Sequence, residues 1–249
     1  MGEGLAYELQ RESGSAMLIQ RPAAARGQTQ TAWLDSRHTF SFGHYHDPAW
    51  MGFGALRVLN EDRVAVDAGF AEHGHANMEI LTWVLDGALA HRDSSGAEGV
   101  IRPGELQRMS AGHGIRHSEM NATAQAPVHF LQVWIQPDRS NRAPSYAQRG
   151  YTPLQLGAGW TLLAAPVAVA ADTLPLHAEA RVWAWRPRAG ARATLALAAP
   201  RAWLHVARGA VRVNDGIALG VGDGLGLRDE AALELSAERD SELLLFELL

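Results

Sequence analysis

Short hydrophobic runs separated by turn residues dominate the pattern along the chain. Most runs are about four to eight residues long, contain β-branched or aromatic residues, and are bounded by Gly, Pro, Asp or Asn, which is typical of strands and turns. Long segments with the ~3.6-residue period of an amphipathic helix are missing. We therefore expect an all-β protein. The predicted strands lie at 53–59, 63–70, 78–85, 128–135, 160–163, 181–185, 202–206, 210–213 and 243–246.

A polar stretch divides the predicted strands into two groups. It covers 139–150 and contains Arg, Ser, Asn and Pro, while each side of it holds on the order of 100 residues, enough to bury a core. We expect one domain over 17–138, a linker over 139–150 and a second domain over 151–249, built as sandwiches or barrels. Residues 1–16 are predicted to be a mobile tail, with Met17 as an alternative start of translation.

A faint internal repeat relates the two predicted domains. The segment WVLDGAL resembles HVARGAV when Gly87 is superposed on Gly209, and a Gly-acid turn follows in both domains, at Gly104 and Gly222. A strand, a Gly turn, a second strand and a Gly-acid turn, occurring twice, indicate two copies of one β unit.

Composition and charge narrow the class of protein. Hydrophobic residues make up 47% and charged residues 20% of the chain, which is typical of globular proteins. A net charge of −5 gives no reason to expect direct binding to nucleic acid. No apolar run approaches the ~20 residues of a membrane helix, and the first residues lack the apolar middle of a secretory signal. A cytoplasmic protein without membrane contact is expected.

Two residue types are absent, and their absence excludes several chemistries. The chain has no Cys, so disulfides, Cys-bound zinc, iron–sulfur clusters and thiol catalysis are excluded. All 22 basic residues are Arg, which removes Schiff-base chemistry and any Lys general acid. A metal would have to be held by His, carboxylate, backbone carbonyl or water.

The spacing of histidines suggests a metal site. His73 and His75 are separated by one residue in a predicted strand, so their side chains project to the same face, and the same holds for His117 and Glu119. If the two strands are close, three imidazoles and one carboxylate converge. That set suits a divalent transition metal and leaves about two of six octahedral positions for water, substrate or dioxygen.

The internal repeat offers a comparison for this site. Superposing the turns places Leu195 and Leu197 where the first pair of histidines lies. It places Leu235 and Ala237 opposite His117 and Glu119 in the same way. The second domain is therefore expected to have an apolar interior and no metal ligands.

Several motifs together resemble the pirin family, in particular its bacterial branch described as quercetin 2,3-dioxygenase-like. They are WLDSRHTFSF, MGFGALRVLN, HGH and QRMSAGHGIRHSE, beginning at residues 33, 51, 73 and 107. The resemblance covers about residues 17 to 151 and implies two cupin (jelly-roll) β-barrels, with a metal in the N-terminal barrel only. The ligands it implies are His73, His75, His117 and Glu119. Glu79 is expected to lie near the site without binding the metal.

The resemblance also implies a cofactor and a reaction. The cofactor would be one divalent transition metal, iron(II), for which zinc, nickel, copper, manganese or cobalt can substitute. The reaction would open the ring of a flavonol-type polyphenol with O2, with Glu119 accepting the proton of the substrate hydroxyl.

An alternative stays open at this point. A pirin-like protein can instead be a non-enzymatic, redox-sensing regulator that binds protein partners through an iron-dependent surface. A sugar isomerase on the same barrel is disfavoured because the chain has no Lys.

Overall fold

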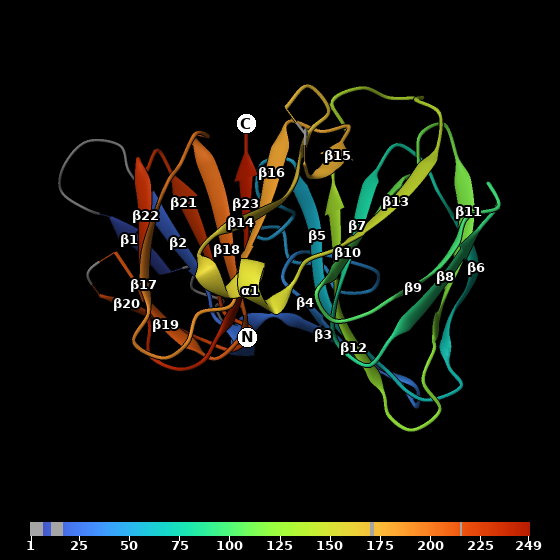
Figure 1. Cartoon of the computed structure of the whole chain (residues 1–249), viewed down its shortest axis with the longest axis horizontal. Coiled ribbons are helices and arrows are strands. Elements are labelled where there is room, and N and C mark those ends of the chain that lie inside the picture. Colours follow the sequence, from blue (N-terminus) through green and yellow to red (C-terminus); the bar gives the residue numbers. More distant parts are fainter. Residues whose placement is uncertain (1–6, 11–16, 170–171, 215) are drawn as a thin grey trace. The chain divides into compact units, whose positions relative to one another are not determined.

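The computed structural model describes residues 7–10, 17–169, 172–214 and 216–249, and nearly all of its elements are strands (Figure 1). The helical elements of this part of the chain are η1 (Ala23–Ala25) and α1 (Pro153–Ala158). Within the same residues, no helix is long and apolar enough to cross a membrane. The prediction of an all-β protein is confirmed.

The chain divides into two compact units, each formed from separate stretches of sequence. Residues 27–151 and 165–179 form the histidine-rich unit, and residues up to 26, 152–164 and 180–249 form the C-terminal unit. The N-terminal strands belong to the C-terminal unit because β2 (Met17–Arg21) pairs antiparallel with β21 (Gly224–Arg228). Of the predicted tail, β1 (Tyr7–Gln10) pairs with β2, and residues 1–6 and 11–16 lie outside the described residues.

The histidine-rich unit is built from two antiparallel sheets. Its larger sheet has the order β13-β10-β7-β12-β5-β4-β3, and its smaller sheet has the order β6-β11-β8-β9. The bounds are β3 (Gly27–Gln30), β4 (Leu34–His38), β5 (Leu56–Val64), β6 (Gly69–His75), β7 (Glu79–Asp86), β8 (Leu89–Asp93), β9 (Glu98–Ile101), β10 (Glu105–Ser110), β11 (Ile115–Asn121), β12 (Val128–Ile135) and β13 (Ser145–Gly150), with β15 (Leu174–Leu176) beside β10 and β13.

The C-terminal unit repeats this architecture. Within it the larger sheet runs β1-β2-β21-β18-β23-β16-β14, and the smaller sheet runs β17-β22-β19-β20. The remaining bounds are β14 (Thr161–Pro166), β16 (Ala180–Trp185), β17 (Arg192–Ala196), β18 (Arg201–Arg208), β19 (Ala210–Val213), β20 (Ile217–Gly220), β22 (Ala232–Ala237) and β23 (Glu242–Leu248).

The internal repeat is visible in strand order and in turn geometry. The order β6-β11-β8-β9 corresponds to β17-β22-β19-β20, strand by strand. The superposed turn glycines, Gly87 and Gly209, have φ of 77° and 83°, and Gly104 and Gly222 have φ of 88° and 82°. These left-handed conformations favour Gly because it has no Cβ. The two units are therefore copies of one fold.

The two units differ in what fills the space between their sheets. In the C-terminal unit one large apolar cluster contains Leu204, Leu225 and Leu243 from the larger sheet together with Val211 and Leu235 from the smaller one. Ala237 is also buried, and Leu195 and Leu197 pack against the cluster. The expected apolar interior of this unit is confirmed.

The histidine-rich unit contains smaller apolar clusters with polar side chains buried beside them. Val64, Val84, Leu89 and Phe130 form a cluster to which both sheets contribute. Ile80, Met109 and Ile115 belong to a second apolar cluster. Polar side chains are buried as well, among them His117 and Glu119, whereas His73 and His75 are half-buried.

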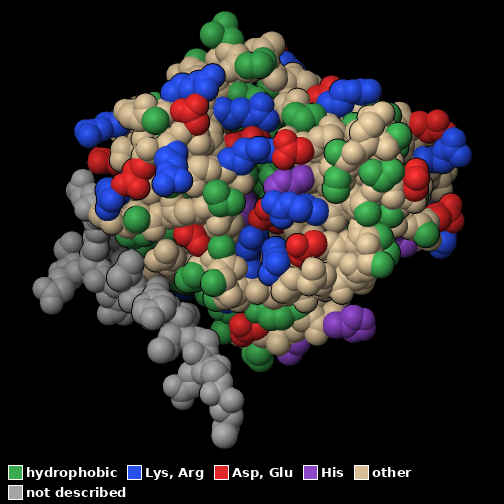
Figure 2. Space-filling model, turned by 90° about the horizontal axis from the view of Figure 1, so that it is seen from below, with side chains coloured by type: hydrophobic (Ala, Val, Ile, Leu, Met, Phe, Trp, Pro, Cys, Tyr) green, Lys and Arg blue, Asp and Glu red, His purple; other side chains and the backbone are tan. Residues whose placement is uncertain are grey.

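On the surface, charges of both signs are interspersed with apolar groups across the face shown in Figure 2. Exposed arginines form ion pairs with nearby acids, such as Arg92 with Glu98 at 2.8 Å. Pairs of this kind contribute little to stability because solvent screens them.

Candidate metal centre

Two neighbouring strands of the smaller sheet carry the four predicted ligands. His73 and His75 lie on β6, His117 and Glu119 lie on β11, and the antiparallel register sets His117 opposite His73. The centroids of the three imidazole rings are 4.5 to 4.9 Å apart. One ligand nitrogen from each ring can be chosen so that all three lie within 4.8 Å of one another. The structure thus brings the three histidines together.

The His73 ring directs a lone pair towards the His117 ring. His73 Nδ1 lies 2.8 Å from the carbonyl oxygen of Ala71, which can only accept, so Nδ1 carries the hydrogen and Nε2 of the neutral ring is left with the lone pair. That Nε2 lies 3.1 Å from His117 Nε2. Ligating histidines commonly donate their other N–H to a backbone carbonyl in this way. The arrangement fits a cation held between the rings.

Burial keeps two of the imidazoles neutral. The pKa of His75 is lowered to about 4, first by burial and then by the nearby His73. The pKa of His117 is lowered to about 3, again mainly by burial, with further contributions from His73 and His75. Neutral imidazole is the form that binds a metal, so both rings are available as ligands at neutral pH.

Glu119 is placed differently from the three histidines. A bulge in β11 between His117 and Glu119 shifts the register, so that Glu119 pairs with Phe70. Its carboxylate groups with His117 and His91, within 4.8 Å, and the grouping of His73, His75 and His117 does not include it. The predicted quartet therefore consists of three converging imidazoles with a carboxylate beside His117.

The Glu119 carboxyl group is held by one amide. Gln132 Nε2 donates to both of its oxygens, at 3.1 and 2.8 Å, and Thr82 Oγ1 donates to Gln132 Oε1 at 3.1 Å. Burial raises the pKa of Glu119, and the hydrogen bond from Gln132 opposes that rise. A carboxyl group with a raised pKa is a better proton acceptor than an exposed one.

A cavity of about 180 Å³ adjoins these residues in the histidine-rich unit. Its apolar walls include Phe42, Phe70 and Trp134, and the Trp134 ring meets the edge of His75 with centroids 4.8 Å apart. Its polar lining consists of Thr29, Ser36, His38, His44, Asn60, Asp62, His73, His75, Glu119 and Gln132. An aromatic ligand in this cavity would therefore contact three of the candidate ligands, His73, His75 and Glu119.

Asp62 is a cavity residue that sequence reasoning did not find. Ser36 donates a hydrogen bond to its carboxyl group, while its Oδ1 has no hydrogen-bond partner among the described residues. Burial raises the pKa of Asp62 to about 7, with smaller contributions from Glu119 and Glu61. The sequence signal that could have found it is the alternate spacing of Asn60 and Asp62, which places both side chains on one face of β5.

For two other residues, Glu79 and His91, the structure shows positions that the sequence analysis did not give. Glu79, expected near the site, accepts a hydrogen bond from the backbone N–H of His177 at 3.1 Å and is not among the residues lining the cavity. His91, to which no role was given, is buried and lies beside His117, with Nδ1 atoms 3.4 Å apart. The sequence feature that could have revealed it is the spacing of His91 and Asp93, which places both side chains on the same face of β8.

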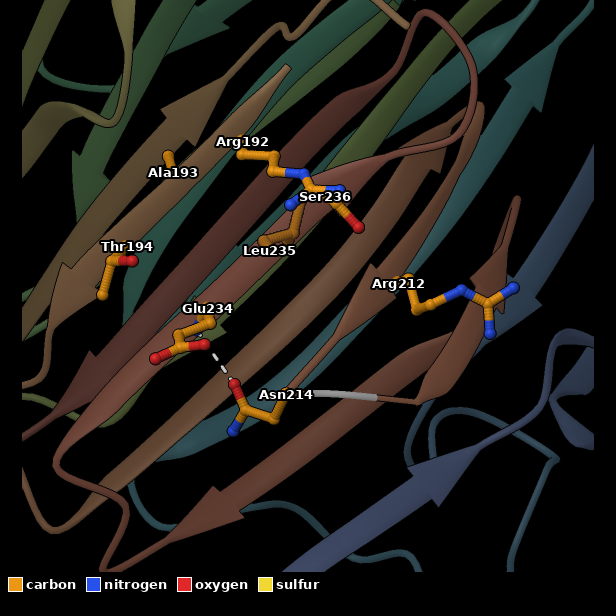
Figure 3. Close-up of a pocket in the computed structure, with 8 residues that line it drawn as sticks. All are labelled: Arg192, Ala193, Thr194, Arg212, Asn214, Glu234, Leu235 and Ser236. Carbon is orange, nitrogen blue, oxygen red and sulfur yellow. Dashed lines mark hydrogen bonds between the residues drawn. The ribbon is translucent and has the colours of Figure 1, made fainter. Parts of the chain in front are cut away.

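The C-terminal unit has a depression of a different kind, on its smaller sheet (Figure 3). The backbone N–H of Glu234 donates to Asn214 Oδ1 at 2.9 Å, and the side chains of Arg192 and Arg212 lie well apart. Arg212 is paired with Glu238 at 2.6 Å. Because the two guanidinium groups do not converge, this depression lacks the features of a built anion site.

Comparison with known proteins identifies both parts of the chain. The family model described as Pirin matches residues 20–135, and the model described as Quercetinase C-terminal cupin domain matches residues 162–248. The chain is 41% identical over 233 residues to the quercetin 2,3-dioxygenase of Escherichia coli K12, covering 93% of this chain and 99% of that protein. It is 39% identical over 230 residues to a pirin-like protein of Caulobacter vibrioides, covering 92% and 98%.

Solved structures agree with these relationships. The crystal structure of YhhW from Escherichia coli has a TM-score of 0.88 at 40% identity and covers 94% of this chain and 98% of its own. The structure of the bacterial pirin YhhW in complex with nickel(II) has a TM-score of 0.87 and covers 93% and 99%.

Proposed function

Since this chain belongs to the pirin family, we propose that it is a metal-dependent dioxygenase that opens the ring of a quercetin-like flavonol with O2. The observation that carries the proposal is the convergence of three imidazoles, two of which, His73 and His75, line a cavity with aromatic sides. Two Escherichia coli relatives that are 41% identical to this chain carry the name quercetin 2,3-dioxygenase.

We infer that His73, His75 and His117 would hold the metal through nitrogen, with Glu119 as a fourth ligand. The donor set supports this because imidazole and carboxylate suit divalent transition metals. Iron(II) is the metal we propose, while the nickel(II) bound by the bacterial pirin YhhW fits the tendency of nickel to replace iron at such sites. When bound, the metal would lower the pKa of a coordinated hydroxyl group and supply the redox chemistry.

The protein's own residues would handle the substrate and its proton. Glu119 would accept the proton of the flavonol hydroxyl at a carboxylate oxygen, as a carboxylate acting as general base can. Gln132 would hold the carboxyl group in position through both oxygens, as it does now. The heterocycle then opens and carbon monoxide leaves, as in the family's reaction.

The cavity would enclose only part of such a substrate. At about 180 Å³ it is smaller than the ~300 Å³ at the lower end for small-molecule sites. Phe42, Phe70 and Trp134 would surround one ring of the flavonol and exclude water from it, and the remainder would extend past the cavity.

Oxygen consumption tests the proposal directly. Iron-loaded protein should consume O2 and bleach quercetin, and His73→Ala should abolish both. His46→Ala is the control, because His46 is exposed and does not line the cavity. Bleaching that survives removal of the metal would refute the mechanism. Metal binding without turnover of any polyphenol would favour the non-enzymatic regulator instead.

A further inference from the structure

We propose that Asp93 and His91 form a hydrogen-bonded relay that fixes His117 in the tautomer whose Nε2 faces the metal. His91 and Asp93 are then positioning residues for the metal site. This inference rests on the proposed role of His117 as a ligand. The relay itself is a property of the metal-free protein and can be tested without activity.

The relay is a chain of three side chains on two adjacent strands. Asp93 and His91 lie on β8, which pairs with β11, the strand of His117. Asp93 Oδ2 lies 3.0 Å from His91 Nε2, and His91 Nδ1 lies 3.4 Å from His117 Nδ1. At the other end, His117 Nε2 faces His73 Nε2 at 3.1 Å. The chain thus runs from a carboxylate to the centre of the candidate metal site.

Starting from Asp93, hydrogen-bonding rules give one assignment of protons along this chain, and it leaves the facing Nε2 atoms of His117 and His73, 3.1 Å apart, with no hydrogen between them. The Asp93 carboxylate can only accept, so His91 must donate from Nε2. The neutral His91 ring then has its lone pair on Nδ1 and can only accept there. His117 must therefore donate from Nδ1, which leaves its Nε2 lone pair free for a cation. The carbonyl of Ala71 gives His73 the same tautomer.

The far end of the relay is firmly anchored. Asp93 Oδ1 accepts hydrogen bonds from Ser95 N at 2.9 Å, Ser95 Oγ at 2.5 Å and Ala97 N at 3.2 Å. The Asp93 and His91 side chains are both 0% exposed, and the His91 ring stacks on Tyr146 with centroids 4.8 Å apart. Buried groups held in this way orient a metal ligand at a fixed angle.

The anchoring makes Asp93→Asn a sharp test. Two backbone N–H groups and a hydroxyl point at Oδ1, so the amide oxygen of Asn would stay there and its NH2 would face His91 Nε2. His91 would then accept at Nε2 and donate from Nδ1. His117 Nδ1 would have to accept, its hydrogen would move to Nε2, and the position needed by the metal would be blocked.

Two measurements read out this change. Long-range ¹H–¹⁵N spectra of the metal-free protein distinguish the two tautomers of His117, and nickel(II) titration gives the affinity. We expect the Nδ1–H tautomer in the wild type and the Nε2–H tautomer in Asp93→Asn, with nickel(II) bound about 10- to 100-fold more weakly. Glu61→Gln is the matched control, because it alters a buried carboxylate–imidazole pair, Glu61 with His129 at 2.9 Å, outside the relay.

A second pair of variants separates the relay from packing alone. His91→Asn keeps an acceptor oxygen where Nδ1 lies. In His91→Leu, the leucine has about the volume of the histidine it replaces but offers no acceptor. We expect His91→Asn to retain most of the nickel(II) affinity and His91→Leu to lose at least about tenfold. An Nε2–H tautomer in the wild type, an unchanged tautomer in Asp93→Asn, or equal losses in the two His91 variants would overturn the relay. If the tautomers behave as expected and no flavonol is turned over, only the proposed function fails.

Discussion

Asp62→Asn should stabilise the metal-free protein, and more so at high pH. The carboxyl group is buried in the cavity wall, where one of its oxygens has no hydrogen-bond partner in the described part of the chain, and its pKa is raised from 3.8 to about 7, mainly by burial. A folded-state pKa above the unfolded value means that the folded protein binds the proton more tightly. The contribution of Asp62 to stability is therefore most favourable below pH 3.8 and is lost as the pH rises through about 7.

The size of the effect follows from the shift in pKa. Each pKa unit corresponds to about 1.4 kcal/mol, so a shift of about 3 units costs about 4 kcal/mol when Asp62 is fully ionised. At pH 5 the cost is about 2 kcal/mol, because the unfolded state alone has lost most of its proton. Asn resembles the protonated acid and does not ionise, so the variant should avoid this cost at every pH.

Urea unfolding of the metal-free proteins at pH 5 and pH 8 measures the difference. The gain in unfolding free energy of Asp62→Asn over wild type should roughly double between these pH values. Asp67→Asn provides the control, because Asp67 is exposed in the same unit and its replacement should change stability by less than about 0.5 kcal/mol. An equal gain at both pH values would show that the carboxyl group does not titrate as the cavity geometry requires.

Three further outcomes follow from the structure. Gly209→Ala should destabilise the protein by more than about 2 kcal/mol in thermal unfolding without weakening nickel(II) binding, because φ is 83° and a Cβ would collide with Ser241. The depressed pKa of His75 should make the metal-free protein lose stability as pH falls from 6.5 towards 4, a loss that His75→Gln should reduce in acid unfolding curves. Gln132→Leu should lower the rate of quercetin turnover at least tenfold, with a smaller effect on KM, because Glu119 loses the amide that donates to both of its oxygens.

The local part of the candidate site could be predicted from the sequence. Residues at alternate positions of a strand share a face, so the two His-x-His histidines and the His117–Glu119 pair could each be placed on one side. The internal repeat predicted that the two units are copies of one β fold and that the interior of the second is apolar. These inferences depend only on short-range geometry and on comparing one half of the chain with the other.

Contacts between strands distant in the chain could not be predicted in the same way. His91 and Asp93 show the same alternate spacing, but their relation to His117 depends on the register between β8 and β11. The position of Glu119 depends on a bulge in β11 that the sequence does not signal. Similarly, the pairing of β2 with β21 joins residues more than 200 positions apart, which a division at the polar stretch around 139–150 could not reveal.

The two units show why one fold can hold either a metal site or an apolar core. In both, the smaller sheet presents equivalent positions to the interior, and the side chains there decide the outcome. Leucine and alanine in the C-terminal unit bury apolar area, which stabilises the fold directly. In the histidine-rich unit, burial shifts the pKa of His75, His117, Glu119 and Asp62 towards the neutral form, so their charged forms destabilise the fold. A bound cation would stabilise the folded protein through its ligands, because it binds the anionic form of a carboxylate and the neutral form of an imidazole. The polar interior is thus best explained as a binding site whose stability is completed by its ligand.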